Sequence, residues 1–418
     1  MAEPFLLGVN YWPRRKAMYW WSNFDADEVR EEFDVIASIG MRVVRLFLLW
    51  DDWMPTSDQV DAQRMRDFKV VCDIAAERGL QLDVTFFTGH MSGPNWSPRW
   101  LLSTDTPPVS PYFGYVRQVL SDGQIVPNGG YRNMFHDTEA LNAERLLLKT
   151  VVGEFKNHPA IWMWNLGNEP DLFAHPHTAA DGKAWVKEMR DLILTVDPSH
   201  KVTCGLHADS VMNDNGLRIH DVFGEADLAV MHGYPMYSHV ARHNLDPDFV
   251  PFLCALTTAL SGKPCLAEEW GGCTAPLGHD SEVWEWTSYQ GTHRKQFMAG
   301  ENAFADYVGE VLPKLVEVGS PGAMLWCYAD YVESLWDRPP CDEHGAKHER
   351  HFGLVRPDGS LKPHAEVIRK FAATQPIAQT PSRTVTLDVT PEEYYANPSG
   401  SAERLYKAYI AQYETGNA

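Results

Sequence analysis

Apolar, β-branched runs alternate with amphipathic patterns along most of this chain. Eight of the runs have the length and composition of buried strands, and they cover residues 5–12, 41–50, 80–90, 160–167, 201–207, 226–235, 263–272 and 322–331. The segment 25–40 illustrates the helical pattern: it begins with acidic residues and stops at Gly40. Its apolar residues Val29, Phe33 and Ile36 share one face. Further helices are predicted over residues 61–79, 137–157, 179–196, 247–261, 293–319 and 363–374.

The alternation predicts an α/β fold in which the parallel strands close into a (β/α)8 TIM barrel. An open, doubly wound sheet is the alternative, and it is weakened because no G-x-G-x-x-G sequence follows the first strand. We expect the barrel to occupy residues 1–375, with an insertion at about 91–135 that is too long for a plain connector and is a candidate functional loop. Residues 376–418 do not continue the regular alternation of the barrel. Within them RTVTLDVTP has the pattern of a strand and SAERLYKAYIAQYE that of a helix. We expect these residues to form a short C-terminal appendage.

The composition narrows the choice of partners. A formal net charge of −20 opposes binding to nucleic acid and to anionic membrane surfaces, so we expect neither, and a homo-oligomer is left open. The seven Cys include no C-x-x-C pair, which argues against a disulfide framework or a zinc site. The start MAEPFLLGVNYW leads directly into a strand, so we expect no signal peptide and a cytoplasmic protein with reduced thiols. Some of the fifteen Trp suit stacking on a sugar ring, and the others suit a large core.

The strand ends carry the candidate chemistry, because the active site of such a barrel lies at the C-terminal ends of its strands. Glu, His, Asn, Tyr and Trp are concentrated at these ends, and this set suits a carbohydrate site. The candidates are Asn168 and Glu169 of the fourth strand, Glu268 and Glu269 of the seventh, and Arg45, His90, His232, Tyr234, Trp326 and Asp330, with Trp12 after the first strand.

Two carboxylates from the fourth and seventh strands would face each other across the barrel mouth. Glycoside hydrolysis needs one carboxyl group to protonate the leaving oxygen and a second to attack or stabilise the sugar cation. Their pKa values must differ, so their surroundings must differ. Asn168 is placed to bind a sugar hydroxyl beside Glu169, while Arg45 and Tyr234 are placed to keep the opposite carboxylate ionised.

N-E-P at the end of the fourth strand together with E-W-G at the end of the seventh resembles clan A glycoside hydrolases, most closely family 5, over roughly residues 5–374. The ending GLVRPDGSLKPHAEVIRKF is similar to the close of these barrels. The resemblance implies a retaining mechanism without a metal or cofactor. It also implies roles for single residues. Glu169 matches the acid/base, Glu269 the nucleophile and Asn168 the ligand of the 2-hydroxyl. Arg45, His232 and Tyr234 match the supports of nucleophile and substrate, Trp326 matches the platform under the reacting sugar, and His90 fits a further position of the family site.

Several alternatives stay open. Successive side chains of a strand point to opposite faces, so we expect only one of Glu268 and Glu269 to aim at the substrate, and family position favours Glu269. Glu169 could instead be a capping carboxylate, Arg45 a buried ion-pair member, and His90 a wall residue. We expect His207 to be structural, and His175, His177, His348 and His351 to lie in solvated loops, since no usual metal-ligand spacing surrounds them.

The start GVNYWPRR, the MHGYP strand and the absence of a secretion signal are similar to the intracellular, exo-acting β-mannosidase branch of family 5. We expect residues 91–135 to wall off one end of the cleft, which would favour release of single sugars from short oligosaccharides. The alternatives are an endo-β-mannanase, a β-glucosidase or a β-galactosidase on the same barrel, a carbohydrate-binding barrel without activity, and a metal-dependent barrel of unrelated chemistry.

Overall fold

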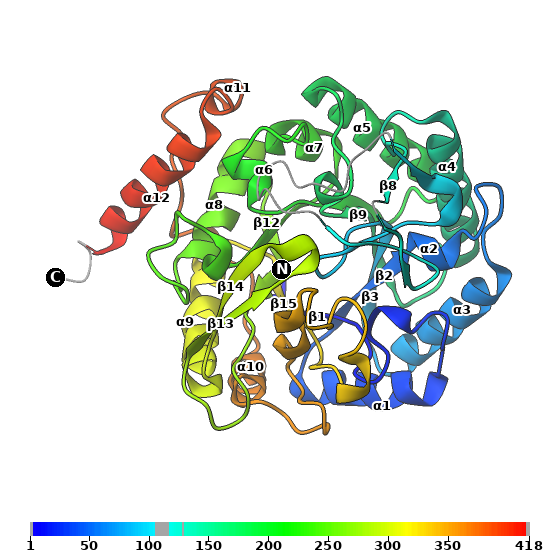
Figure 1. The fold of residues 1–418 in the computed structure, drawn as a ribbon. Coiled ribbons are helices and arrows are strands. Elements are labelled where there is room, and N and C mark those ends of the chain that lie inside the picture. The colour runs from blue at the N-terminus through cyan, green and yellow to red at the C-terminus, as the bar shows by residue number, and fades with distance from the viewer. Residues whose placement is uncertain (1–2, 105–116, 128, 415–418) are drawn as a thin grey trace.

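The computed structural model describes residues 3–104, 117–127 and 129–414. Its main sheet has eight parallel strands in the order β10-β9-β3-β2-β1-β15-β12-β11 (Figure 1). Their bounds are β1 Leu6–Asn10, β2 Val43–Leu49, β3 Gln81–Thr88, β9 Ile161–Asn168, β10 Lys201–Gly205, β11 Ala229–Gly233, β12 Cys265–Gly271 and β15 Gly322–Trp326. The backbone N–H of His232 donates to Leu206 O at 2.8 Å and that of Asp227 to Val202 O at 2.8 Å. These bonds join the two outer strands, so the predicted TIM barrel is confirmed.

A helix follows each barrel strand and covers its outer side (Figure 1). The covering helices are α1 Ala26–Ile39, α3 Ala62–Glu77, α4 Thr138–Phe155, α5 Ala179–Val196, α7 Ile219–Glu225, α8 Phe249–Ser261, α9 Glu301–Glu317 and α10 Pro363–Ala373, with two single-turn helices, α2 Trp50–Trp53 and α6 Asp209–Met212, in connecting loops. In α1, the Asp25 side chain accepts hydrogen bonds from the N–H groups of Asp27 and Glu28, and Gly40 ends the helix at φ 92°.

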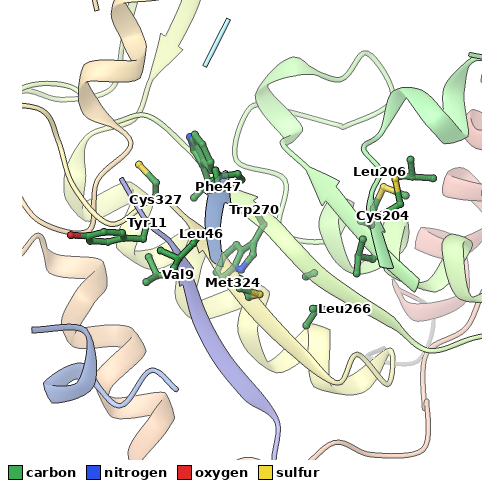
Figure 2. Packing of buried hydrophobic residues seen from close by; sticks show 14 of the residues in the cluster. Val9, Tyr11, Leu46, Phe47, Cys204, Leu206, Leu266, Trp270, Met324 and Cys327 are labelled. Atoms are coloured by element: carbon green, nitrogen blue, oxygen red, sulfur yellow. The ribbon is translucent and has the colours of Figure 1, made fainter. Parts of the chain in front are cut away.

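The core lies inside the barrel and between the strands and their helices. Every residue of β2 and of β12 is buried, as expected for parallel strands covered on both faces. Val9, Leu46, Leu266 and Met324, from four different strands, are at most 1% exposed and belong to one hydrophobic cluster (Figure 2). All seven Cys are buried as free thiols. Within the described residues, none of the helices is long and apolar enough to cross a membrane.

The region 91–135 forms short strands above the barrel where it is described. These strands are β4 Asn95–Trp96, β5 Leu102–Ser103, β6 Val119–Ser121, β7 Gln124–Ile125 and β8 Gly130–Tyr131. β4, β6 and β7 make one small sheet, and β5 pairs with β8. Residues 105–116 of the predicted insertion lie outside the described residues.

The helix predicted over residues 293–319 is wrong in its first part. Residues His293–Met298 form β14, which pairs antiparallel with β13 Glu282–Thr287, and α9 begins only at Glu301. The sequence HRKQFM alternates between more exposed and more buried positions, which is the period of a strand. The β13–β14 hairpin stands at the mouth of the barrel (Figure 1).

The C-terminal residues lie along the outside of the barrel (Figure 1). The predicted helix is present as α12 Pro398–Glu414, after the single turn α11 Pro391–Tyr394. Tyr406 of α12 packs on Phe252 of α8 with ring centroids 4.7 Å apart, and its hydroxyl donates to Asp246 Oδ2 at 2.6 Å. The strand predicted for residues 383–391 is wrong. Its alternating Val and Leu side chains pack against the core, but among the described residues its backbone pairs with no strand.

Candidate active site

The C-terminal ends of the barrel strands surround a cavity of about 820 Å³, a size that suits a small-molecule ligand. Most of the residues predicted for the site line this cavity together: His90, Asn168, Glu169, His232, Tyr234, Glu269 and Trp326. Arg45 is fully buried beneath them and does not line the cavity. The structure therefore assembles one site from strand ends that lie more than 200 residues apart in the sequence, as the contact between Arg45 and Glu269 shows.

Glu169 occupies the turn that follows β9. Its backbone is left-handed, with φ 46° and ψ 55°, and the 3-10 turn Pro170–Leu172 begins directly after it. A non-glycine residue in this region is strained, and such strain concentrates at functional sites. The Glu169 N–H donates to Gly205 O at 2.9 Å, and its Oε1 lies 2.9 Å from His232 Nδ1. The N-E-P sequence thus bends the chain where the side chain must enter the cavity.

Glu269 is held from two sides. Arg45 Nη1 donates to its Oε1 at 2.5 Å, and the Tyr234 hydroxyl donates to its Oε2 at 2.9 Å. The guanidinium does not lose its charge in proteins, so this pair favours an ionised Glu269.

Glu268 also points into the barrel, which contradicts the expectation that neighbouring side chains of β12 face opposite sides. The register of β12 shifts against both of its neighbours: Met231 pairs with Ala267 but His232 pairs with Glu269, and Ala323 pairs with Ala267 but Leu325 pairs with Trp270. An extra residue in a strand breaks the alternation of its side chains. Glu268 is 0% exposed, lies below the cavity and accepts a bond from Asn165 Nδ2 at 3.0 Å. Only Glu269 of the two lines the cavity.

Arg45 lies below the cavity and connects Glu269 of β12 with Asn168 of β9. Besides Glu269, its guanidinium donates to Asn168 Oδ1 at 3.1 Å and to Thr85 Oγ1 at 2.9 Å. Asn168 donates its own Nδ2 to the backbone oxygen of His90 at 3.2 Å. The amide oxygen and the carboxylate that the sequence predicts to touch the same sugar are therefore fixed by one buried cation.

The carboxyl groups of Glu169 and Glu269 have different electrostatic surroundings. Burial raises the pKa of Glu169, but the His207 charge and the hydrogen bond from His232 lower it further, so its net direction is down. Burial raises the pKa of Glu269 by more than the His232 and Arg45 charges lower it, so its net direction is up. An acid/base needs a pKa high enough to carry a proton and a nucleophile must be ionised. These two directions are the reverse of those that the predicted roles require. The hydrogen bonds that Arg45 and Tyr234 donate to Glu269 favour its ionised form and agree with the role of nucleophile.

Two further histidines line the cavity with opposite charge states. Burial and the Arg117 charge lower the pKa of His90 to about 3, so this ring is neutral, and its Nδ1 lies 2.7 Å from Asn95 Oδ1. Burial lowers the pKa of His207, but the Asp171 charge at 2.9 Å raises it to about 10. His207 was expected to be structural, and its pairing with Asp171 agrees with that expectation, although one edge of the ring reaches the cavity.

Trp12 and Asp330 were predicted to contact substrate, and the structure places both outside the cavity. Trp12 is 0% exposed and stacks on Phe47 at 5.1 Å, and Phe47 in turn packs edge-on against Trp326 at 5.9 Å. Trp12 therefore supports Trp326 from behind. Asp330 accepts bonds from Lys362 Nζ and from the Gly353 N–H, each at 2.7 Å, so its carboxylate is already occupied by structural partners.

The sequence analysis missed two further carboxyl groups that line the cavity, Asp209 and Glu349. Glu349 lies in the 3-10 segment Lys347–His351, and burial raises its pKa to about 8 even though Ser92 and Trp326 lower it. The segment was interpreted as a solvated loop, but His348 and His351 are 3% and 8% exposed, so that interpretation is wrong. These residues become buried only when the chain after β15 folds back over the barrel, so the local sequence pattern does not predict their burial.

Glu169, His232 and Glu269 each offer one ligand atom, and these atoms lie within 4.8 Å of one another. This spacing would admit a metal ion, but the donor set does not suit one. Arg45 already bonds Glu269, and His232 Nδ1 already bonds Glu169, so an added cation would face a guanidinium and compete with the ring for the same oxygens.

Solved structures resemble the whole chain. A GH5_18 protein from Streptomyces cattleya, in complex with GlcNAc, superposes with a TM-score of 0.78 at 20% identity and covers 100% of this chain and 92% of its own. An exo-β-1,4-mannosidase from Opitutaceae bacterium strain TAV5 superposes with a TM-score of 0.69 at 25% identity, covering 90% of this chain and 60% of its own.

Curated relatives match shorter parts of the sequence. Mannan endo-1,4-beta-mannosidase 4 of Oryza sativa subsp. japonica is 34% identical over 145 residues, or 28% of this chain and 29% of the relative. Mannan endo-1,4-beta-mannosidase A of Hypocrea jecorina is 23% identical over 298 residues, or 64% of this chain and 61% of the relative. The chain thus spans less than two thirds of the length of either relative.

The family model described as Cellulase (glycosyl hydrolase family 5) matches residues 6–299. This range contains seven of the eight barrel strands, Glu169, Glu269 and the buried Arg45. The chain therefore belongs to glycosyl hydrolase family 5.

Proposed function

We propose that this protein is a retaining glycoside hydrolase that releases single β-linked mannose units from the ends of short oligosaccharides. Glu269 is the nucleophile and Glu169 the acid/base. The spacing of these two groups carries the proposal: one oxygen of each lies within 4.8 Å of the other. Retaining enzymes hold their carboxyl groups about 5–5.5 Å apart, whereas inverting enzymes need roughly 6.5–9.5 Å to admit a water molecule.

The geometry supports a double displacement. In the first step Glu269 Oε attacks the anomeric carbon, and Glu169 gives its proton to the departing glycosidic oxygen. In the second step Glu169 takes a proton from water, and the hydroxide displaces Glu269 from the sugar. Arg45 and Tyr234 orient Glu269 for attack, since each bonds a different oxygen of its carboxylate.

Two walls of the cavity support exo action. The insertion after β3 contributes Met91, Ser92, Gly93 and Arg117. The β13–β14 hairpin contributes Thr292, His293, Arg294, Lys295 and Gln296. A cavity bounded in this way favours the end of a short chain over the middle of a polymer, because a polymer must pass through an open cleft on both sides of the reacting sugar.

The choice of mannose rests on the 25% identical exo-β-1,4-mannosidase, and endo-β-mannanase activity is the second candidate because the curated relatives carry that name. A time course on mannohexaose separates the two. Early release of mannose supports exo action, while early mannobiose, mannotriose and mannotetraose without mannose would reject it.

A panel of nitrophenyl β-glycosides tests the sugar, with β-mannoside expected to react fastest. Proton NMR of the first product tests the stereochemistry, because a retaining enzyme releases the β anomer before mutarotation. Glu269→Gln is the control for background hydrolysis. Absence of hydrolysis of every glycoside, with sugar binding preserved, would instead favour a non-catalytic carbohydrate-binding barrel.

A further inference from the structure

His232 connects the cavity to a carboxylate buried below it. The Nδ1 atom lies 2.9 Å from Glu169 Oε1, and the Nε2 atom lies 2.9 Å from Glu268 Oε2. The ring is 1% exposed and Glu268 is 0% exposed. The acid/base is thus one end of a continuous Glu169–His232–Glu268 chain, and the first Glu of the E-E-W-G sequence is the other end.

The hydrogen bonds limit where protons can lie. An ionised carboxylate only accepts, and a neutral imidazole donates from one nitrogen only. Two ionised carboxylates can therefore be satisfied at the same time only by a ring that is protonated on both nitrogens. Glu268 is well placed to be one of them, since Arg45 Nη2 lies 3.4 Å from its Oε2 and Asn165 donates to its Oε1.

The surrounding charges agree with this distribution. Titratable and polar groups face the Glu169–His232–Glu268 chain from every side. They are Arg45 of β2, Asp83 of β3, His90 after β3, Asn165 of β9, Cys204 of β10, His207 after β10, Tyr234 after β11, Glu269 of β12 and, across the cavity, Glu349. Burial raises the pKa of Asp83 well above its ordinary value and so favours its neutral form. Arg45 and a charged His232 then balance Glu268 and Glu269 while Glu169 holds its proton. Once Glu269 is bonded to the sugar and Glu169 is ionised, the same two cations balance Glu268 and Glu169, and His207 balances Asp171 throughout.

We propose that Glu268 is a positioning residue that keeps His232 protonated on both nitrogens, so that His232 donates to Glu169 throughout the reaction. The proposal rests on the proposed function. Donation from His232 makes protonated Glu169 a stronger acid toward the glycosidic oxygen and stabilises the carboxylate that is left. Glu169 loses one proton in the first step and recovers one from water in the second, while His232 keeps both of its protons.

The first test is the pH profile of kcat/KM on a nitrophenyl glycoside for wild type and Glu268→Gln. The neutral amide of this variant cannot hold the second proton of His232, so the pKa of Glu169 rises, and the alkaline limb moves to higher pH by about 1–2 units. The matched control is Glu144→Gln, because Glu144 is 0% exposed, accepts a bond from Trp185 and lies outside the cavity. Glu144→Gln leaves the limb in place. Uniform loss of rate in Glu268→Gln with an unmoved limb would overturn the proposal.

The second test does not depend on activity. Nitrogen NMR of wild-type protein labelled in histidine, at pH 7, is expected to show both His232 nitrogens protonated, in line with the raised pKa of this ring, about 9. The signal is assigned by its absence in His232→Gln. A neutral ring in wild type would contradict the proposal even if the enzyme is an active mannosidase. A doubly protonated ring in a protein that hydrolyses no β-mannoside would refute the proposed substrate and leave the proton assignment standing.

Discussion

Arg45 and Glu269 are 224 positions apart in the sequence, yet Arg45 Nη1 lies 2.5 Å from Glu269 Oε1 inside the barrel. The Arg45 side chain is 0% exposed and that of Glu269 is 5% exposed. Water therefore screens this ion pair little, and a buried charge pair of this kind holds its geometry tightly. Glu269 is held from below by a residue that does not line the cavity.

Replacing Glu269 by Ala is expected to lower kcat by about 10⁴- to 10⁶-fold, because the covalent step has no attacking group. Azide fits the space of the lost carboxylate and should restore turnover with an α-mannosyl azide product. Product configuration by NMR is the measurement. Glu268→Ala serves as comparison. If azide rescues that variant and not Glu269→Ala, the nucleophile is Glu268.

Replacing Glu169 by Ala removes the proton donor of the first step. The loss in kcat/KM is expected to be about 10²- to 10⁴-fold for mannobiose and much smaller for a dinitrophenyl mannoside, whose leaving group needs no proton. Azide should accelerate breakdown of the glycosyl-enzyme and give the β-mannosyl azide. Equal losses for both substrates would contradict the assignment of Glu169 as acid.

Glu349 is expected to act as a neutral hydrogen-bonding group at pH 6, because burial raises its pKa to about 8. Glu349→Gln keeps a neutral polar group of the same size and should retain most of the activity. Glu349→Ala should raise KM by about tenfold, the worth of roughly one hydrogen bond. Steady-state kinetics at pH 6 provide the comparison. An equal rise in KM for Glu349→Gln and Glu349→Ala would indicate that an ionised Glu349 is required.

Asp330→Asn is expected to destabilise the fold without changing the chemistry. The substitution leaves the Lys362 charge buried without its partner, which costs about 3–5 kcal/mol. Thermal unfolding measures this loss, and kcat/KM per folded molecule should stay at the wild-type level, because Asp330 lies outside the cavity. A fall in kcat/KM per folded molecule without loss of stability would indicate that Asp330 contacts the substrate.

The same pair predicts a pH dependence of stability. Burial raises the pKa of Asp330, but Lys362 and His351 lower it further, so the folded pKa lies below the unfolded value of about 3.9. The stabilisation is therefore complete above the unfolded pKa and is lost as pH falls through the folded one. Wild type should lose more stability than Asp330→Asn between about pH 5 and about pH 3 in urea titrations, and parallel losses would refute the pairing.

The strand pattern and the strand-end residues could be predicted because they depend on local properties. The period of apolar residues located all eight barrel strands, and N-E-P and E-W-G marked two facing ends. The β13–β14 hairpin was mistaken for the start of α9, since six residues of mixed polarity carry a weak periodic signal. The seven-residue helix α7 received no predicted range for the same reason.

By itself the sequence predicted the barrel and the two facing carboxylates from residue type and spacing along the chain, and the resemblance of N-E-P and E-W-G to family 5 predicted the family. Only the tertiary structure showed that both Glu268 and Glu269 turn inward, with Glu269 lining the cavity and Glu268 buried below it. The register shift of β12 turns both side chains inward, and register is set by the neighbouring strands β11 and β15, not by β12 alone. The same holds for Glu349 and Asp330, whose surroundings come from segments that are distant in sequence, so their burial and partners could not be read from the residues around them.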